Sequence, residues 1–506
     1  METVLNALAL ITDPYTLGVM ALAAMFGLFV GAIPGLTATM ATALLIPFTF
    51  FMDPVPAIAA IVATVATAIF AGDIPGALLR IPGTPASAAY CDEAYAMTKK
   101  GLAERALGIA LVTSVIGGLA GSVVLSVSAP ALAEFAIRFS SYEYFWLACL
   151  GLSCAVIIST GSTIKGFVSL LIGLFIATIG IDGTAGHPRF TFGSIELMGG
   201  VSFIPAMIGM FAISEVLRYV ASTRTVIVVP QQSVGSIFSG LGAVLSKYKF
   251  NIIRGSSIGA VVGILPGAGA DIAAWICYAI SKKRSKEPEK FGTGHPEGLV
   301  DAGAANNASL AGAWVPAIVF GIPGDSITAI VIGVLYMKGM NPGPMVFIQN
   351  PELIYAVFIA FFIANLALLP LGFAAIRLSR QILRIPRRVL MPLILMFCMV
   401  GAFAINNTVF GITVMLVLGI LAYLMEENGF PVAPAILGIV LGGMVEDNFM
   451  ASMIKADGSL LGFFSRPIAA TLGVITILLW LTPILAASWR YLHRHKNRPA
   501  RLKSDP

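Results

Sequence analysis

The side chains best suited to bind a substrate in this chain are small hydroxyls and amides that follow breaks in apolar segments. Proline removes a backbone N–H and clashes with the preceding turn, and glycine accepts almost any backbone conformation, so a Pro-Gly pair interrupts a helix. The N–H groups freed at such a break, together with the helix dipole, favour an anion. The candidate substrate-binding residues at and after the breaks are Pro34, Gly35, Thr37, Thr39, Pro82, Gly83, Thr84, Ser87, Pro266, Gly267, Gly269, Asn306, Asn307, Pro323, Gly324, Ser326 and Thr328.

A packing explanation competes with this interpretation. Serine and threonine in apolar helices often hydrogen-bond to their own backbone, and small residues allow helices to approach closely. For any single hydroxyl we favour the packing explanation. For the breaks taken together we favour a binding site, because a pattern that recurs needs a shared cause.

Ionisable residues near the breaks are possible charge partners. Arg80 either binds a carboxylate, pairs with Asp73 or extends to the membrane interface, and the sequence leaves these options open. Asp271 and Asp325 follow breaks in the second half; each either neutralises a cation or caps a helix, and we favour the cap.

The same segments suit a coupling ion. Freed carbonyl groups with the side-chain oxygens of Thr39, Asn306 and Asn307 suit Na⁺, so we expect Na⁺ or H⁺ as coupling ion. The histidines and cysteines form no HExxH motif and no metal-binding cluster, so we expect no cofactor, no metal centre and no enzymatic activity.

The breaks occur in two halves of the chain. Residues 31–35 (GAIPG) return at 263–267 (GILPG), an offset of 232, and residues 81–84 (IPGT) return at 322–325 (IPGD), an offset of 241. Interrupted apolar segments in corresponding positions of two halves are typical of secondary transporters. Lys282 follows the first break of the second half, whereas Lys99 follows the second break of the first half. Because basic loops face the cytoplasm, the two repeats are predicted to have inverted orientations.

The composition indicates a membrane protein. The 506 residues are 58% hydrophobic and 11% charged, with a mean hydropathy of +0.92, whereas soluble domains carry roughly 25% charged residues. The basic residues behind the net charge of +6 gather in loops and at the C-terminus, so a nucleic-acid partner is not expected. We predict an all-α integral membrane fold with about 10–12 transmembrane helices plus re-entrant or broken helices and two inverted repeats.

The predicted organisation has three parts. Residues 1–230 form the first membrane repeat, with broken-helix elements at 31–39 and 72–97. Residues 231–489 form the second, with a cytoplasmic loop at 281–298 and broken-helix elements at 263–271 and 316–328. Residues 490–506 form a basic cytoplasmic tail.

Several motifs together resemble the large permease subunit of tripartite tricarboxylate transporters, the TctA family. They are residues 31–47 (GAIPGLTATMATALLIP), 81–101 (IPGTPASAAYCDEAYAMTKKG), 263–269 (GILPGAG), 288–292 (PEKFG), 304–308 (AANNA) and 321–324 (GIPG). The resemblance extends from about residue 17 to about residue 467 and implies a multi-pass protein of the bacterial inner membrane.

The resemblance also implies the function and the partners. It implies a permease subunit that imports tricarboxylates or related carboxylates by symport, with a small four-span membrane subunit of the TctB type and a periplasmic solute-binding protein of the TctC type. The chain departs from the family pattern in two places. Asp92-Glu93 replaces a frequent Asp-Gly, where we expect an effect on a surface turn alone. Ala302-Gly303 replaces a frequent Pro-Glu, which leaves the coupling ion and its stoichiometry open.

Other function classes fit less well. A stand-alone secondary carrier or exporter of organic anions, without a binding protein, is the main alternative. A multispan membrane enzyme would need a catalytic constellation that the sequence lacks. A channel would need a ring of charges or a repeated carbonyl filter, and neither motif is present.

Overall fold

The structure is a computed structural model that describes residues 2–158, 162–183, 186–221, 237–238, 240–266, 269–383 and 387–496. Nearly every described element is helical, which confirms the predicted all-α class. The elements of the first half are α1 (Glu2–Thr12), α2 (Pro14–Ala32), α3 (Ala38–Phe50), α4 (Pro54–Ala71), α5 (Asp73–Leu79), η1 (Ser87–Ala89), α6 (Cys91–Lys99), α7 (Ala103–Ala136), α8 (Ser141–Ile158), α9 (Thr163–Ala177), β1 (Gly180–Ile181), β2 (Pro188–Arg189), η2 (Glu196–Gly199), α10 (Phe203–Ile208), η3 (Gly209–Ile213) and α11 (Ser214–Ala221).

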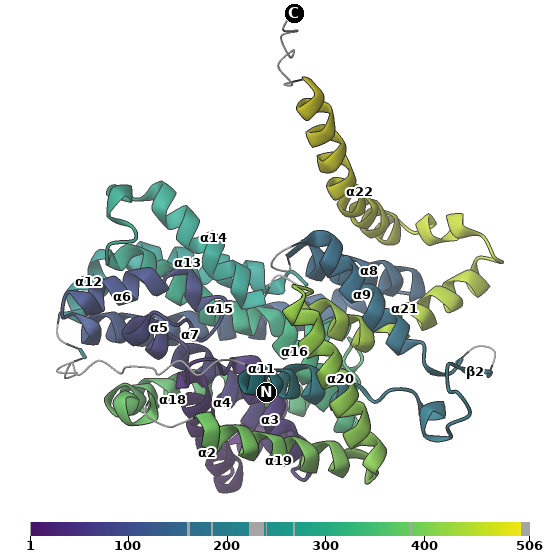
Figure 1. Ribbon diagram of the computed structural model, residues 1–506, viewed down its shortest axis with the longest axis horizontal. Helices are drawn as coiled ribbons and strands as arrows, with labels where there is room; N and C mark the ends of the chain where they lie inside the picture. Colours follow the sequence, from purple (N-terminus) through teal and green to yellow (C-terminus); the bar gives the residue numbers. More distant parts are fainter. Residues whose placement is uncertain are drawn as a thin grey trace, which may run out of the picture.

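The second half continues the helical pattern. Its elements are α12 (Leu241–Lys247), α13 (Lys249–Ile264), α14 (Gly269–Arg284), η4 (Pro288–Lys290), α15 (Pro296–Phe320), α16 (Ser326–Met337), α17 (Val346–Gln349), α18 (Pro351–Leu383), α19 (Arg387–Asn406), α20 (Val409–Glu427), α21 (Val432–Lys455), η5 (Leu460–Phe464) and α22 (Pro467–Lys496). The N-terminal part of α22 packs on α8, where Trp480 Nε1 donates to Ser153 Oγ (2.5 Å), and its C-terminal end extends away from the other helices (Figure 1). The basic tail predicted from residue 490 begins inside α22, and residues 497–506 lie outside the described ranges.

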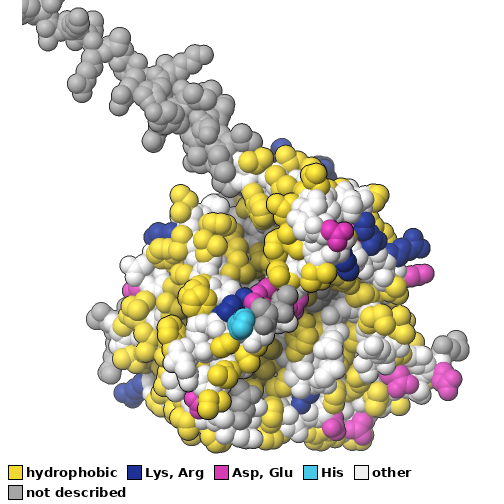
Figure 2. Space-filling model, turned by 90° about the vertical axis from the view of Figure 1, so that its right-hand side faces the viewer, with side chains coloured by type: hydrophobic (Ala, Val, Ile, Leu, Met, Phe, Trp, Pro, Cys, Tyr) yellow, Lys and Arg dark blue, Asp and Glu magenta, His cyan; other side chains and the backbone are white. Residues whose placement is uncertain are grey.

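The helices have the apolar character that a bilayer requires. Within the described ranges, eight helices are long and apolar enough to cross a membrane, and six further apolar helices have 10–17 residues. Hydrophobic side chains cover much of the face in Figure 2, with charged groups at scattered positions. Length alone does not decide which shorter helices cross, so the number of spans stays a prediction.

The Pro-Gly elements lie between helices wherever the structure describes them, as the sequence predicts. Pro34-Gly35 separates α2 from α3, and Pro82-Gly83 lies between α5 and η1; Pro266 follows α13, and Pro323-Gly324 lies between α15 and α16. Gly35 has φ 86° and Gly269 has φ 51°, a left-handed conformation that glycine adopts without strain.

Glycines bring the helices beside the breaks into close contact. A Cβ atom on Gly27 or Gly31 of α2 would lie 2.3 Å from the Thr64 carbonyl oxygen or 2.5 Å from the Ala68 carbonyl oxygen of α4. In the second half, a Cβ on Gly259 or Gly263 of α13 would lie 2.4 Å from the carbonyl oxygen of Ala305 or of Ser309 on α15. These backbones touch because the positions carry no side chain.

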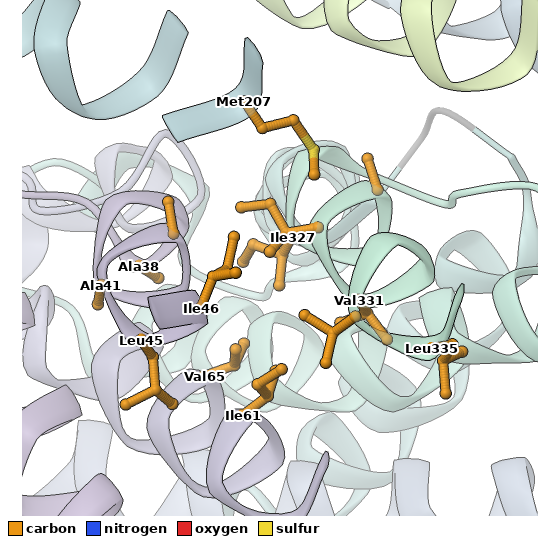
Figure 3. Packing of buried hydrophobic residues seen from close by; sticks show 14 of the residues in the cluster. Ala38, Ala41, Leu45, Ile46, Ile61, Val65, Met207, Ile327, Val331 and Leu335 are labelled. Atoms are coloured by element: carbon orange, nitrogen blue, oxygen red, sulfur yellow. The ribbon is translucent and has the colours of Figure 1, made fainter. Parts of the chain in front are cut away.

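The short helices α3 and α16 pack against each other beside α4. Ala38, Leu45 and Ile46 of α3 lie in one buried cluster with Ile327 and Val331 of α16 (Figure 3). At their C-terminal ends, Lys338 Nζ donates to the carbonyl oxygens of Phe50 (2.8 Å) and Met52 (2.5 Å). The helix starts at the first and the last break are therefore held side by side.

Candidate substrate cavity

A cavity of about 430 Å³ lies where the breaks of the two halves meet. From the first half it is lined by Gly35, Thr37, Thr39 and Thr84, and from the second half by Asn306, Asp325 and Ser326. Pockets for small ligands have volumes of roughly 300–1,000 Å³. The cavity is therefore large enough for a small organic anion, and seven of the residues singled out in the sequence line it.

The starts of α3 and α16 both face this cavity through capped turns. Thr37 Oγ1 accepts from Met40 N (3.2 Å). Asp325 Oδ1 accepts from Thr328 N (2.7 Å), and Thr328 Oγ1 accepts from Asp325 N (2.8 Å). The predicted capping role of Asp325 is confirmed. The positive ends of two helix dipoles are thus directed at the cavity.

The turn at Thr84 has the same reciprocal bonds as the turn at Asp325. Ser87 N donates to Thr84 Oγ1 (3.0 Å), and Thr84 N donates to Ser87 Oγ (3.1 Å). The hydroxyls of Ser87 and Thr328 are therefore used inside their turns, and both side chains are buried outside the cavity lining. For these two residues the packing explanation holds in this structure.

The two asparagines are buried and only partly hydrogen-bonded. Asn306 Nδ2 donates to the Tyr90 hydroxyl (2.9 Å), and Asn307 Nδ2 donates to the Ala66 carbonyl oxygen (3.5 Å). The Oδ1 atoms of both have no partner within the described part of the chain. Asn306 lines the cavity and Asn307 does not.

The other candidate residues that the structure describes do not line the cavity. A Cβ on Gly269 would lie 2.7 Å from Asp325 Cβ, so this glycine leaves room for the Asp325 side chain, and a Cβ on Gly83 would lie 2.4 Å from Gly72 Cα, so Gly83 permits a backbone contact. Pro34, Pro323 and Gly324 are buried, Pro266 is half-buried, and Pro82 is exposed. Gly267 and the side chain of Asp271 lie outside the described residues.

Arg80 and Asp73 do not pair with each other. Arg80 Nε donates to Asp92 Oδ1 at 2.7 Å, and the two side chains are 61% and 60% exposed. Asp73 is buried, with 3% exposure, and its Oδ1 accepts from the Tyr90 hydroxyl at 2.8 Å. Arg80 caps the C-terminus of α5 in a left-handed conformation (φ 60°). The interpretation of Arg80 as a partner of Asp73 is therefore wrong.

The cavity lining also contains an ion-pair group whose residues are not among those predicted from the sequence. Arg218 of α11 binds Glu215 (2.7 Å) and also Glu426 at the end of α20, and all three residues line the cavity. Two opposite charges three residues apart near the end of an apolar segment were the available signal, since ionisable residues there are costly. Glu426 is too distant in sequence for its pairing to be predicted.

Trp275 of α14 also lines the cavity. Its Nε1 donates to the Pro85 carbonyl oxygen at 3.1 Å, and its side chain is 50% exposed. The indole therefore connects the second half to the break at Pro82-Gly83.

Glu93 contradicts the expectation that Asp92-Glu93 affects a surface turn alone. Its side chain has 0% exposure. It accepts hydrogen bonds from the backbone N–H groups of Gly292, Gly294 (2.7 Å) and His295 (2.8 Å) and from the Tyr278 hydroxyl (2.9 Å). The carboxylate therefore fastens the loop 281–298 to α6, because it gathers donors that would otherwise be unpaired.

Comparisons with known proteins identify the family of the chain. A family model described as "Tripartite tricarboxylate transporter TctA family" matches residues 17–437. An uncharacterized 52.8 kDa protein in the TAR-I ttuC' 3' region of Agrobacterium vitis is 33% identical over 467 residues, 91% of this chain and 92% of the relative. An uncharacterized protein in the TAR-II ttuC' 3' region of the same organism is 36% identical over 228 residues, 44% of this chain and 94% of the relative. No solved structure matches. Since the family model and the first relative both cover most of its length, the chain belongs to the tripartite tricarboxylate transporter TctA family.

Proposed function

We propose that this chain is the permease subunit of a carboxylate importer that is driven by a Na⁺ or H⁺ gradient and works by alternating access. It works in the bacterial inner membrane, with its C-terminus in the cytoplasm. Its partners are a small four-span membrane subunit and a periplasmic solute-binding protein. The observation that carries the proposal is the convergence of two capped helix starts, at Thr37 and Asp325, on one cavity.

The charges of the lining support ion coupling. The described lining has three carboxylates, on Glu215, Asp325 and Glu426, and one guanidinium, on Arg218. A carboxylate substrate that entered alone would add negative charge to a lining with excess carboxylates. A cation that binds with the substrate restores the balance, since like charges close together in a poorly solvated site repel strongly.

Contacts at equal sequence offsets support the two repeats. The contacts of Gly27 and Gly31 with Thr64 and Ala68 match those of Gly259 and Gly263 with Ala305 and Ser309, at offsets of 232 and 241. The reciprocal turn of Thr84 and Ser87 matches that of Asp325 and Thr328 at the offset of 241. A duplication explains why unrelated side chains make the same contacts.

Loop positions support the inverted orientation. The loop after α14 packs on the end of α6, where Lys100 Nζ donates to the Thr293 carbonyl oxygen (2.7 Å). The segment after α3 instead contacts the end of α16 through Lys338. Since α14 corresponds to α3 by the offset of 232, the equivalent helices end in different places, as an inverted pair requires.

Uptake into proteoliposomes that contain the full chain and its small membrane partner tests the proposal. Radiolabelled citrate and tartrate are supplied with the binding protein under an imposed Na⁺ or H⁺ gradient. We expect gradient-driven uptake that falls strongly in Thr39→Val and Ser326→Ala, because both remove a cavity hydroxyl. Thr413→Val is the matched control, because Thr413 is an exposed hydroxyl on α20 outside the cavity lining.

The same experiment distinguishes the proposed importer from the main alternative, a stand-alone carrier. Uptake that proceeds equally well without the binding protein would replace the proposal with a stand-alone carrier of organic anions. Uptake that depends on neither gradient would show that transport is not coupled to Na⁺ or H⁺.

A further inference from the structure

Asp73 is a buried carboxylate that the cavity lining does not include. Its Oδ1 accepts the Tyr90 hydroxyl, and its Oδ2 has no hydrogen-bond partner. Among the described residues, no lysine, arginine or histidine lies within ion-pair distance of it. Burying an unpaired carboxylate is costly, so Asp73 is stable there only when a proton or another cation neutralises it.

Hydrogen bonds connect Asp73 to the cavity in two steps. Asn306 lines the cavity, and its Nδ2 donates to the Tyr90 hydroxyl at 2.9 Å. The Tyr90 hydroxyl in turn donates to Asp73 at 2.8 Å. A change of charge on Asp73 therefore acts directly on the hydroxyl that holds a cavity residue, and Tyr90 itself is only 1% exposed.

The architecture itself does not require a carboxylate at this position. At the offset of 241 that relates the two halves, Asp73 corresponds to Trp314, which is also buried, with 0% exposure. Both residues precede a matched pair of hydrogen bonds, Ile81 N to Pro75 O (3.3 Å) and Ile322 N to Pro316 O (3.2 Å). The same backbone therefore accommodates an apolar ring, and the carboxylate of the first half needs another explanation.

The surroundings of Asp73 suit a proton better than a metal ion. The hollow beside it measures about 10 Å³, and its lining has four alanines, at positions 77, 94, 106 and 110, and one hydroxyl besides Tyr90, on Ser87. The titratable groups next to Asp73 in the described part of the chain are Tyr90 and Cys91, whose Sγ donates to the Gly76 carbonyl oxygen (3.4 Å). Hard divalent cations need about six or more oxygen ligands, whereas the side chains of this hollow carry oxygen atoms on Asp73, Ser87 and Tyr90 alone, and a proton needs no such shell.

We propose that Asp73 is the proton-binding residue that couples the H⁺ gradient to transport, with Tyr90 and Asn306 as positioning residues that link it to the cavity. The proposal rests on the proposed function of the chain as a gradient-driven carrier. Asp73 takes one proton when it is accessible from one side and releases that proton when it is accessible from the other. The carboxyl is neutral with the proton and negative without it, and no electron moves.

Infrared spectroscopy of the full chain in lipid vesicles tests the proton site without any substrate. The difference spectrum between acidic and alkaline buffer contains the C=O stretch of a protonated buried carboxyl that titrates. We expect this band to be lost in Asp73→Asn and kept in Asp92→Asn, the matched control, because Asp92 is exposed and paired with Arg80. A band that is unchanged in Asp73→Asn overturns the proposal.

Transport measurements test the coupling itself. In proteoliposomes with radiolabelled citrate, Asp73→Asn is expected to lose accumulation driven by a pH gradient and to keep exchange of internal for external citrate. Tyr90→Phe, which leaves the carboxyl in place, is expected to shift the pH at which accumulation is half-maximal. Accumulation by Asp73→Asn that equals the wild type, or that follows a Na⁺ gradient at every pH, overturns the assignment. Failure of the unaltered chain to move any carboxylate would contradict the proposed function. The infrared band would still show whether Asp73 binds a proton.

Discussion

Among the described residues that line the cavity, Arg218 is the one with a positively charged side chain. Its guanidinium is 39% exposed and holds two carboxylates that line the same cavity, Glu215 and Glu426. A guanidinium presents a fork of donors that fits a carboxylate, so a substrate carboxylate can replace one of these partners with little loss of hydrogen bonding. Under the proposed function, Arg218 is therefore the residue that we expect to bind a substrate carboxylate.

Replacing Arg218 tests this role at the residue scale. We expect Arg218→Gln to weaken citrate binding by about 2 kcal/mol, or roughly thirtyfold, since hydrogen bonds to charged groups contribute about 1.5–3 kcal/mol. The fluorescence of Trp275, which lines the same cavity, reports binding. Arg80→Gln is the control, because Arg80 is an exposed cation outside the lining. Equal affinities in the two variants would exclude Arg218 from the binding site.

At the scale of elements, the breaks depend on glycines that allow backbones to touch. A Cβ on Gly83 would meet Gly72 Cα at 2.4 Å, and a Cβ on Gly324 would meet Ala313 Cβ at 2.8 Å. These two contacts lie at the offset of 241 and hold the second break of each half against the preceding helix.

We expect Gly83→Ala and Gly324→Ala each to lower the free energy of unfolding by about 1–3 kcal/mol, because the added methyl group overpacks the contact. Gly18→Ala is the control, since Gly18 lies in α2 with no atom within 4 Å of an added Cβ. There the helix propensity of alanine is expected to stabilise the protein by up to about 1 kcal/mol. Thermal unfolding in detergent measures all three, and equal shifts would contradict the argument.

The loop 281–298 depends on a single carboxylate of α6. Glu93→Ala leaves the N–H groups of Gly294 and His295 without their acceptor. Each unsatisfied buried group costs about 1–3 kcal/mol, so the loop is expected to open at least about tenfold more often. Trypsin cleavage after Lys286, an exposed residue between α14 and α15, measures this, and Glu289→Ala, an exposed change in the same loop, is expected to leave the rate unchanged. Equal cleavage of the two variants would show that Glu93 does not hold the loop.

At the scale of the whole molecule, the proposed inverted orientation of the two repeats predicts which loops share a side of the membrane. Lys99→Cys and Lys283→Cys are expected to react with an impermeant maleimide from the cytoplasmic side, and Asp53→Cys and Asn341→Cys from the opposite side. All four positions are exposed, and the unaltered protein, whose described cysteines are buried or half-buried, provides the background. Labelling of Asp53→Cys and Lys283→Cys from the same side would contradict the predicted inverted orientation of the repeats.

The sequence by itself determined the membrane class, the positions of the helix breaks and the cap at Asp325, because these follow from composition and from the local backbone chemistry of Pro, Gly and capping side chains. It did not determine which side chains meet across the fold. The pairing of Arg218 with Glu426, the bonds of Tyr90 to Asp73 and Asn306, and the burial of Glu93 join segments far apart in the chain. Such contacts depend on the depth and rotation of each packed helix, which a sequence pattern constrains only to a face. For that reason the tertiary structure alone decided that Thr84 and Asn306 line the cavity while Ser87 and Thr328 serve their own turns.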